Sequence, residues 1–433
     1  MNLRVPSAHV VLLLCISAQG YAASRHVENW GRTHDGRGVE RVTLVNDRGM
    51  RLGYIDYGAA LVEVDIPDGE GRTRNVLLSL PDLAAYERTK RRYGAIVGRY
   101  AGRIGEARFR LDDRVVNLVA GADGSTLHGG PDGYDKRVWD RQDFDDADSI
   151  GSSFHLVSPD GDQNFPGRLD VQVSYRLLRR QNEFRIEYTA RTDAPTALNL
   201  TNHAFFNLAG AGIRGLDTHR FRIFADRYAV TDSKRVPTGL VASVANTPLD
   251  LRQSVGIAER LQQPSALLGD PPGFDHSYVL STAPNSIALA AAVEDTASGL
   301  SMEIFTTEPS VQFFSGNGFD GSETGSEGIA YRRHDGFALE TQHLPDSPNH
   351  TNFPSTRLDP GRVYRSVTRY RFSARRKAST NTSAPTTSRV FGEHEAETIC
   401  ACGLLHTIDY ANAAQEWASG AARTNDERQR DLA

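Results

Sequence analysis

Polar residues with catalytic potential gather in a few short segments of this 433-residue chain. They are Arg99 and Arg103, His128, Asn202 and His203, Asp275 and His276, Gln312 and Asn317, and Glu340. Such a set suits a sugar, because hydroxyls need donors and acceptors in fixed places and pyranose faces need flat apolar contact. A single glutamate with a histidine also supplies one base and one acid, each with a pKa that can be tuned toward neutrality.

Each of these segments is also compatible with a purely structural role. His128 stands beside two glycines, which is typical of a turn residue. His203 lies among leucines and phenylalanines, as a hydrogen-bonded core histidine would. Asp275 and His276 could form a local hydrogen-bonded turn, and Glu340 could face solvent at the end of a strand. The choice between the two interpretations depends on whether the fold brings the segments together.

The sequence predicts no metal site and no cofactor. The histidines do not have metal-ligand spacing on a helix, and no cysteine accompanies them. Gly98 opens no GxGxxG pattern, and no GxSxG nucleophile elbow occurs. A dinucleotide enzyme and a serine hydrolase of that type are therefore excluded.

The stretch Phe337 to Phe372 contains Glu340, and its sequence predicts the local backbone structure around this residue. An apolar run around Glu340 predicts a strand, and four prolines in the following loop predict ordered, irregular backbone. In the segment Tyr364 to Phe372, aromatic and hydroxyl side chains occupy every second position, and arginines and one valine occupy the positions between them. This alternation predicts a half-buried strand. We expect Glu340 on a strand that leads into a rigid loop.

Short strands separated by turns dominate the rest of the chain. The clearest alternation covers 169–177 and 184–190, and the short link LRRQN between them predicts an antiparallel hairpin with one buried face. Helices are expected only at Pro81 to Thr89 and Ser254 to Leu261. This pattern predicts an all-β fold, a large antiparallel β-sandwich, as one domain over residues 24–373.

The two ends of the chain differ from this domain in composition. Residues 1–23 combine Arg4, an apolar core and small residues, as in a secretory signal peptide, so we expect an exported protein, periplasmic or secreted. Residues 374–433 begin with a Ser/Thr-rich stretch and predict a low-complexity, disordered tail. Cys15 belongs to the signal peptide and Cys400 and Cys402 to the tail, so the domain contains no cysteine.

Composition also limits the partners of the protein. A net charge of −5 and a pI near 6.2 provide no basic footprint for nucleic acid. The apolar core of the signal peptide is too short to span a bilayer, and no other apolar run is long enough. We expect a monomer or weak dimer that binds a small molecule.

Several longer motifs resemble those of the aldose 1-epimerase (galactose mutarotase) family. They occur in the family's order over roughly Val42 to Ser373 and are YGAIVGRYAGRI, LHGGPDGYDKRVWD, SPDGDQNFPGRLDVQVSYRL, NLTNHAFFNLAG, FDHSYVL, TTEPSVQFFSGNGFDG and ETQHLPDSPNHTNFPSTRLDPG. The resemblance implies a galactose mutarotase-like supersandwich with the sugar in an open cleft. It implies catalysis without a cofactor and a free monosaccharide as substrate.

Carried over residue by residue, the resemblance places the catalytic base on Glu340 and the catalytic acid on His203. It places substrate contacts on Arg103, His128, Asp275 and Gln312. The implied mechanism removes the proton of the anomeric hydroxyl with Glu340 while His203, as imidazolium, protonates the ring oxygen. The ring opens, C1–C2 rotates and the ring closes on the other face. His203 must hold its proton near neutral pH, which a nearby Asp275 would favour and burial would oppose.

The chain departs from the family pattern at two positions. Gly102 stands where the family usually has asparagine, so we expect one sugar contact to be missing and the KM to be raised. The alternative is that Gly102 serves a backbone shape that asparagine could not adopt, or that water or another side chain fills the space. Phe205 stands where the family usually has tyrosine, which removes a hydroxyl near His203. Both departures favour an alternative function, a carbohydrate-binding sandwich without turnover, whereas the retention of Glu340 and His203 argues against it.

Two further alternatives are enzymes of other specificity. An epimerase of sugar phosphates needs a cationic clamp, to which Arg99, Arg103 or Lys136 could contribute. A glycosidase needs two carboxylates, for which Asp275 with Glu340 is the available pair. The expected export of the protein argues against a sugar phosphate, and the resemblance gives Asp275 no glycosidase role.

Overall fold

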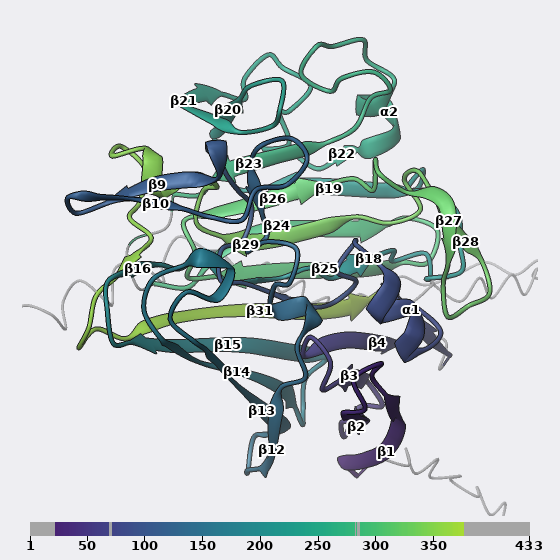
Figure 1. Ribbon diagram of the computed structural model, residues 1–433. Helices are drawn as coiled ribbons and strands as arrows, with labels where there is room; N and C mark the ends of the chain where they lie inside the picture. Colours follow the sequence, from purple (N-terminus) through teal and green to yellow (C-terminus); the bar gives the residue numbers. More distant parts are fainter. Residues whose placement is uncertain (1–21, 69–71, 282, 284–285, 376–433) are drawn as a thin grey trace, which may run out of the picture. The chain divides into compact units, whose positions relative to one another are not determined.

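The computed structural model describes residues 22–68, 72–281, 283 and 286–375 (Figure 1). Nearly all of the expected tail and of the expected signal peptide lie outside the described residues, so the two proposed segments stay predictions. Ala374, the first residue of the expected tail, belongs to a strand. Within the described part, no helix is long and apolar enough to cross a membrane.

The largest sheet has nine strands in the described residues, and its neighbouring strands are all antiparallel. In spatial order they are β12 (Asp140–Asp145), β13 (Ser149–Ser158), β14 (Leu169–Leu178), β15 (Glu183–Thr192), β31 (Tyr364–Ala374), β25 (Leu300–Thr306), β24 (Ala288–Asp295), β19 (His219–Ile223) and β22 (Val255–Gly256). The last strand of the chain, β31, thus lies in the interior of the sheet, between β15 and β25 (Figure 1).

Two further antiparallel sheets of five strands complete the main layers in the described part. One has the order β21 (Pro237–Ser243), β20 (Arg227–Thr231), β23 (Asp275–Val279), β26 (Ser310–Phe314) and β29 (Ala338–Gln342). The other has the order β1 (Ser24–Arg32), β2 (Gly38–Val45), β3 (Arg51–Ile55), β4 (Ala60–Pro67) and β5 (Thr73–Asn75). The predicted all-β, antiparallel β-sandwich is confirmed.

Short two-stranded ladders connect these layers. They are β6 (Leu77–Leu78) with β18 (Phe205–Phe206), β7 (Ile96–Val97) with β17 (Thr201–Asn202), β8 (Arg103–Ile104) with β11 (Thr126–Leu127), β9 (Arg108–Leu111) with β10 (Arg114–Asn117), β16 (Thr196–Ala197) with β30 (Arg357–Leu358), and β27 (Asp320–Thr324) with β28 (Ala330–Arg332). Single 3₁₀ turns occur at Gly105–Ala107, Tyr134–Lys136, Asp162–Asn164 and Ser347–Asn349.

The predicted hairpin is formed by β14 and β15, whose apolar side chains alternate as the sequence indicates. Val173 and Tyr188 face each other across the hairpin and are both buried. The predicted strand near the C-terminal end of the domain is β31, and its buried and half-buried residues alternate. Buried side chains of β14, β15 and β31 pack in one hydrophobic core together with side chains of the two five-stranded sheets.

Both predicted helices exist, but they are shorter than expected. Helix α1 spans Leu83–Arg88, and the Asp82 carboxylate caps it by accepting a 2.8 Å hydrogen bond from the Ala85 amide. Helix α2 spans only Ile257–Leu261, so the expected start at Ser254 is wrong. Val255 and Gly256 form β22 instead, because their backbone extends the edge of the large sheet beside β19.

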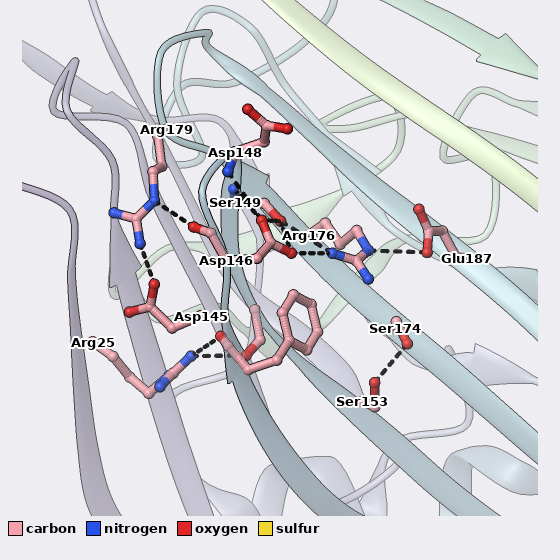
Figure 2. A network of polar contacts seen from close by, with 12 residues as sticks. Arg25, Asp145, Asp146, Asp148, Ser149, Ser153, Ser174, Arg176, Arg179 and Glu187 are labelled. Carbon is pink, nitrogen blue, oxygen red and sulfur yellow. Dashed lines mark hydrogen bonds and ion pairs between the residues drawn. The ribbon is translucent and has the colours of Figure 1, made fainter.

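A polar network covers the outer side of the β12–β15 edge of the large sheet (Figure 2). Arg176 on β14 donates to Glu187 on β15 at 3.0 Å and to Asp146 at 2.8 Å. Arg25 on β1 donates to the Gly151 carbonyl of β13 at 2.9 Å. The network therefore ties two sheets together at the surface.

The sheet that ends in β29 presents one face to the core and the other to a cavity. Leu339 is packed in the core, and the Thr341 hydroxyl lies 2.6 Å from that of Thr368 on β31. Glu340, between them, points the opposite way, as period-two alternation requires. The predicted strand position of Glu340 is thus observed, and the strand is anchored to the large sheet directly behind it.

Candidate active site

A cavity of about 200 Å³ lies over this outward face. Its lining includes every site residue predicted from the sequence: Glu340, His203, Arg103, His128, Asp275, Gln312 and Gly102. These residues come from six separate segments of the chain, and the fold brings them to one place.

Three neighbouring strands hold the acidic side of the cavity. Gln312 on β26 stands directly opposite Glu340 on β29 and Ser277 on β23. The Gln312 amide donates to Asp275 at 2.6 Å, and its carbonyl accepts a short hydrogen bond from the Ser277 hydroxyl. Arg235 donates to the other oxygen of Asp275 at 2.6 Å. The Asp275 carboxylate is therefore fixed by two donors.

His203 is held by its backbone in the link between β17 and β18. Its amide donates to the Ala95 carbonyl and its carbonyl accepts from the Gly94 amide, both at 2.9 Å. Its Nε2 lies 3.6 Å from Oε1 of Glu340, and its ring packs on that of Phe205 at 4.8 Å between centroids. Both side chains are buried, and within the described residues His203 Nδ1 and Glu340 Oε2 have no hydrogen-bond partner. The described protein thus leaves the hydrogen-bonding capacity of these two atoms unused.

Burial controls the protonation of this pair. It raises the pKa of Glu340 to about 8, with a further increase from Asp275 that Arg92 and Arg103 oppose. Burial also lowers the pKa of His203 to about 3, and Arg92 adds to this effect. Of the two influences expected on His203, burial prevails in the free protein. Between about pH 3 and 8 the pair therefore holds one proton, which rests on Glu340.

His128 sits beside His203, with 5.3 Å between the ring centroids. Its amide donates to the Gly102 carbonyl at 2.9 Å, and its Nδ1 accepts from the Gly102 amide at 3.1 Å. Burial lowers its pKa well below the ordinary value, so the ring is neutral and carries its hydrogen on Nε2. His128 thus offers a hydrogen-bond donor to the cavity.

The hydrogen bond at Nδ1 of His128 also decides whether this cluster can bind a metal ion. Ligand atoms of His128, His203 and Glu340 lie within 4.8 Å of one another, a closeness that the sequence did not suggest. A metal-bound histidine normally donates its second ring N–H to an acceptor. His128 instead accepts a hydrogen bond at Nδ1, which leaves its hydrogen on Nε2. This donor set does not fit a metal ion.

The structure leaves no room for an asparagine side chain at Gly102. Its φ is +78°, and a Cβ there would lie 2.7 Å from Cγ of Pro345. The backbone of Gly102 holds His128 twice, once at the His128 amide and once at Nδ1 of its ring. The structure therefore favours the interpretation that Gly102 serves a backbone shape, because a Cβ at this position would collide with Pro345.

We expect Gly102→Asn to destabilise the protein and to leave KM no lower. Overpacking a rigid site costs about 1–3 kcal/mol, which thermal melts will detect. Gly361→Asn is the matched control: its φ is +79°, yet nothing lies within 4 Å of the added Cβ. A lower KM at an unchanged melting temperature would restore the idea of a missing sugar contact.

Arg99 and Lys136, which were considered for a phosphate clamp, have structural roles. The Arg99 guanidinium is buried and donates to the carbonyls of Pro166 and Gly167, each at 2.8 Å. Lys136 donates to three carbonyls at the end of α1, the shortest being 2.7 Å to Thr89. Neither residue lines the cavity. Of the three clamp candidates, Arg103 alone reaches it.

Three other polar residues from the same motifs also lie outside the cavity. The Asn202 amide donates to the Tyr175 hydroxyl at 3.1 Å, and the Asn317 amide donates to the Phe274 carbonyl at 2.8 Å. His276 accepts from the Asp275 amide at 3.0 Å. That local hydrogen bond was expected in a turn, but both residues begin β23, so their side chains point to opposite faces.

Sequence reasoning missed several residues of the cavity. Gln342 is buried, lines the cavity, and neither end of its amide has a hydrogen-bond partner in the described residues. It lies two positions after Glu340, so strand periodicity could have found it. Arg92 also lines the cavity, as do Phe314 and Phe319, which extend the aromatic wall of Phe205. Phe314 lies two positions after Gln312 on β26, so the same periodicity could have found it. Arg92 and Phe319 lie outside the strands, and the sequence contained no signal for them.

Comparisons with known proteins agree with this geometry. The family model described as "Aldose 1-epimerase" matches residues 40–371. The chain is 37% identical to galactose mutarotase of Rattus norvegicus over 338 residues, which are 78% of this chain and 95% of that protein. It is also 37% identical to aldose 1-epimerase of Escherichia coli (strain K12) over 348 residues, 78% of this chain and 97% of that protein.

Solved structures confirm the expected mutarotase-like fold. Galactose 1-epimerase from Lactobacillus acidophilus superposes with a TM-score of 0.72 at 25% identity, covering 82% of this chain and 99% of that one. An aldose epimerase homologue from C. elegans gives a TM-score of 0.70 at the same identity and coverage. With a family model over most of its length and relatives above one third identity, the chain belongs to the aldose 1-epimerase family.

Proposed function

We propose that this protein interconverts the α and β anomers of free aldohexoses, D-glucose and D-galactose, by acid–base ring opening and reclosure. The observation that carries the proposal is the pair formed by Glu340 and His203, buried 3.6 Å apart in a cavity whose other polar groups suit sugar hydroxyls. Family membership makes the protein an isomerase of this class. The preferred sugars and the role of each residue are our assignments.

The reaction needs one proton in the pair, and the free protein holds one. A bound aldose offers its O1 hydroxyl to Glu340 as a donor and its ring oxygen to His203 as an acceptor. These contacts favour the ionised carboxylate and the imidazolium, so the proton moves from Glu340 to His203 on binding. Glu340 then takes the O1 proton while His203 protonates O5, and the C1–O5 bond breaks to give the aldehyde. Rotation about C1–C2 and the reverse transfers close the ring on the other face.

The pH profile tests this one-proton requirement. We expect kcat/KM to be nearly constant from pH 5 to 7 and to fall above about pH 8, where Glu340 loses the proton that the pair shares. The decline should approach tenfold per pH unit. Polarimetry corrected for the buffer-catalysed rate measures it, with circular dichroism to show that the protein stays folded. Activity that still rises from pH 8 to 10 would contradict the mechanism.

Gln342 is expected to bind a sugar hydroxyl, because its buried amide has no partner in the described protein. Gln342→Met keeps the size of the side chain and removes the amide. We expect KM to rise about threefold to tenfold, as for loss of one hydrogen bond, and the melting temperature to stay or rise, since an unpaired buried amide is removed. An unchanged KM with a lower melting temperature would show a purely structural role.

Polarimetry on fresh α-D-glucose and α-D-galactose tests the proposal as a whole. The pure protein should bring the rotation to its equilibrium value faster than buffer does, and Glu340→Gln should not. A binding domain without turnover is the competing function, favoured by Phe205 in place of tyrosine. It would bind the sugars in a calorimeter but leave the rate of mutarotation at its buffer value.

We further propose that the protein is exported to the periplasm or secreted, and that it is a monomer or weak dimer. The support for export is the signal-peptide pattern of residues 1–23. N-terminal sequencing of protein from its native host should find the first 20 or so residues removed. An intact Met1 on cytoplasmic protein would contradict export, and sedimentation would reveal any larger assembly.

A further inference from the structure

The cavity contains more positive charge than a neutral sugar requires. Five basic residues line it, Lys90, Arg91, Arg92, Arg103 and Arg235, against the two acidic residues Asp275 and Glu340. Two of the five are neutralised at hydrogen-bond distance. Arg235 pairs with Asp275 at 2.6 Å, and Arg91 pairs with Glu323 at 2.8 Å. Lys90, Arg92 and Arg103 remain.

Arg92 has no carboxylate at hydrogen-bond distance in the described part of the chain. Its nearest carboxylate is Asp135 at 3.7 Å, beyond a hydrogen bond, and burial raises the pKa of that carboxyl. One guanidinium nitrogen donates to the Lys90 carbonyl at 2.9 Å, but the buried Nε has no partner among the described residues. The side chain is 14% exposed. Arg92 also adopts a left-handed backbone, with φ of +55°, which is uncommon for a residue with a side chain.

Arg103 is in a similar state. Its nearest carboxylate in the described residues is Asp123 at 3.7 Å, which is 40% exposed, and its Nε has no hydrogen-bond partner. The charges of Arg92 and Arg103 both act on Glu340 and on His128. Both residues also line the cavity. Lys90 is exposed at its edge and forms no ion pair in the part of the chain that the structure describes.

We infer that the cavity is adapted to aldoses that carry an anionic group, and specifically to hexuronates, whose C6 carboxylate Arg92 and Arg103 would bind. Two guanidinium groups with free donors match the planar, bidentate geometry of a carboxylate. Lys90 adds an attractive field at the entrance. The inference rests on the proposed function and defines the substrate class for the same site.

The chemistry of a hexuronate also suits the acid–base pair. Its carboxylate is attached to C5, the carbon that bears the ring oxygen O5. When O5 contacts His203, the carboxylate lies close to the same imidazole. A negative charge there favours the imidazolium that must protonate O5, which compensates for the burial that opposes it. The substrate itself would thus help to move the proton from Glu340 to His203.

The test compares D-glucuronate with D-glucose, which share the stereochemistry of C2 to C5 and differ only at C6. Exchange NMR gives kcat/KM for both sugars at low salt. We expect glucuronate to be preferred at least tenfold, as for one charge-assisted contact, and the preference to shrink at high salt. D-glucose 6-phosphate distinguishes the two anionic groups: a preference for it over glucuronate would overturn the assignment to a carboxylate.

Arg92→Gln is the critical variant. It should lower the ratio of the two kcat/KM values, glucuronate over glucose, by about tenfold or more, and Arg92→Lys should retain part of it. Arg114→Gln is the matched control, because it removes the same charge from an exposed strand outside the cavity and should leave the ratio unchanged. A wild-type ratio at or below one, or a ratio that Arg92→Gln does not change, would overturn the inference.

The two proposals fail in different ways. If glucose is accelerated and glucuronate is not, the substrate class is wrong and the epimerase function stands. If neither sugar is accelerated, the epimerase function fails, and calorimetry with glucuronate decides the anionic site alone. Binding that Arg92→Gln abolishes would support the site, and the absence of binding would refute it.

Discussion

Replacement of Glu340 by glutamine is expected to lower kcat/KM by about 10²–10⁴-fold and to raise the melting temperature at neutral and alkaline pH. The loss of activity follows from removal of the proposed base, which glutamine cannot replace. Near-normal turnover of the variant would refute the assignment of Glu340. Polarimetry provides the rate, and correct folding is checked by circular dichroism.

The gain in stability follows from the raised pKa of Glu340. The folded protein has a pKa of about 8 for this group, against 4.5 when it is unperturbed. Between these values the folded state holds a proton that the unfolded state has released, so the free energy of unfolding falls as pH rises from 4.5 to 8. Glutamine does not ionise and escapes this loss. The difference in melting temperature between variant and wild type should therefore grow over this pH range and then level off.

Glu308 provides a matched control with the opposite sign. It is also buried, and burial opposes its ionisation, but His343 at 2.6 Å and the Tyr364 hydroxyl at 2.9 Å outweigh this and lower its pKa. Glu308→Gln should consequently lower the melting temperature near neutral pH. If both variants shifted it in the same direction, burial alone would not explain the behaviour of Glu340.

Replacement of Arg99 by methionine is expected to cost about 3–5 kcal/mol of stability, because several buried acceptors lose their donor at about 1–3 kcal/mol each. The guanidinium also donates to the Ser158 hydroxyl at 2.6 Å and the Pro159 carbonyl at 3.1 Å, besides the Pro166 and Gly167 carbonyls. Methionine would leave these acceptors without a donor. Calorimetry should record a melting temperature lower by about 5–10 °C.

Arg103→Met separates stability from function in the same segment. Arg103 lines the cavity, so this variant should raise KM strongly and change the melting temperature little. If instead Arg99→Met lost activity at full stability, the division of roles between the two arginines would be wrong.

The distinction between these arginines shows where periodicity stops, since the family resemblance was needed to choose Arg103. They are four residues apart, and β7 and β8 are separated by irregular backbone, so neither helical nor strand periodicity predicts which one faces the cavity. The hairpin β14–β15 could be predicted because its alternation repeats over ten residues in each strand. Helix α2 began late because pairing at the edge of the large sheet overrides local preference.

The chemistry of the site was predictable in its residues but not in its charges. All seven predicted site residues reach one cavity, because the motifs that contain them belong to one family. The resting position of the shared proton depends on how deeply His203 and Glu340 are buried, which only the packed structure determines. Gly102 is a similar case, since the obstacle to a side chain is Pro345, more than 240 positions later in the chain.

The interior position of β31 has a consequence for the order of folding. This strand, made by the last described residues, joins the half of the large sheet that ends in β15 to the half that begins with β25. During synthesis the hairpins β14–β15 and β24–β25 can pair locally, but the gap between them stays open until residue 374 has been made. Until then two long strand edges are exposed, which makes the unfinished chain prone to aggregation. A ribosome-bound chain that ends before Tyr364 should therefore depend on chaperones.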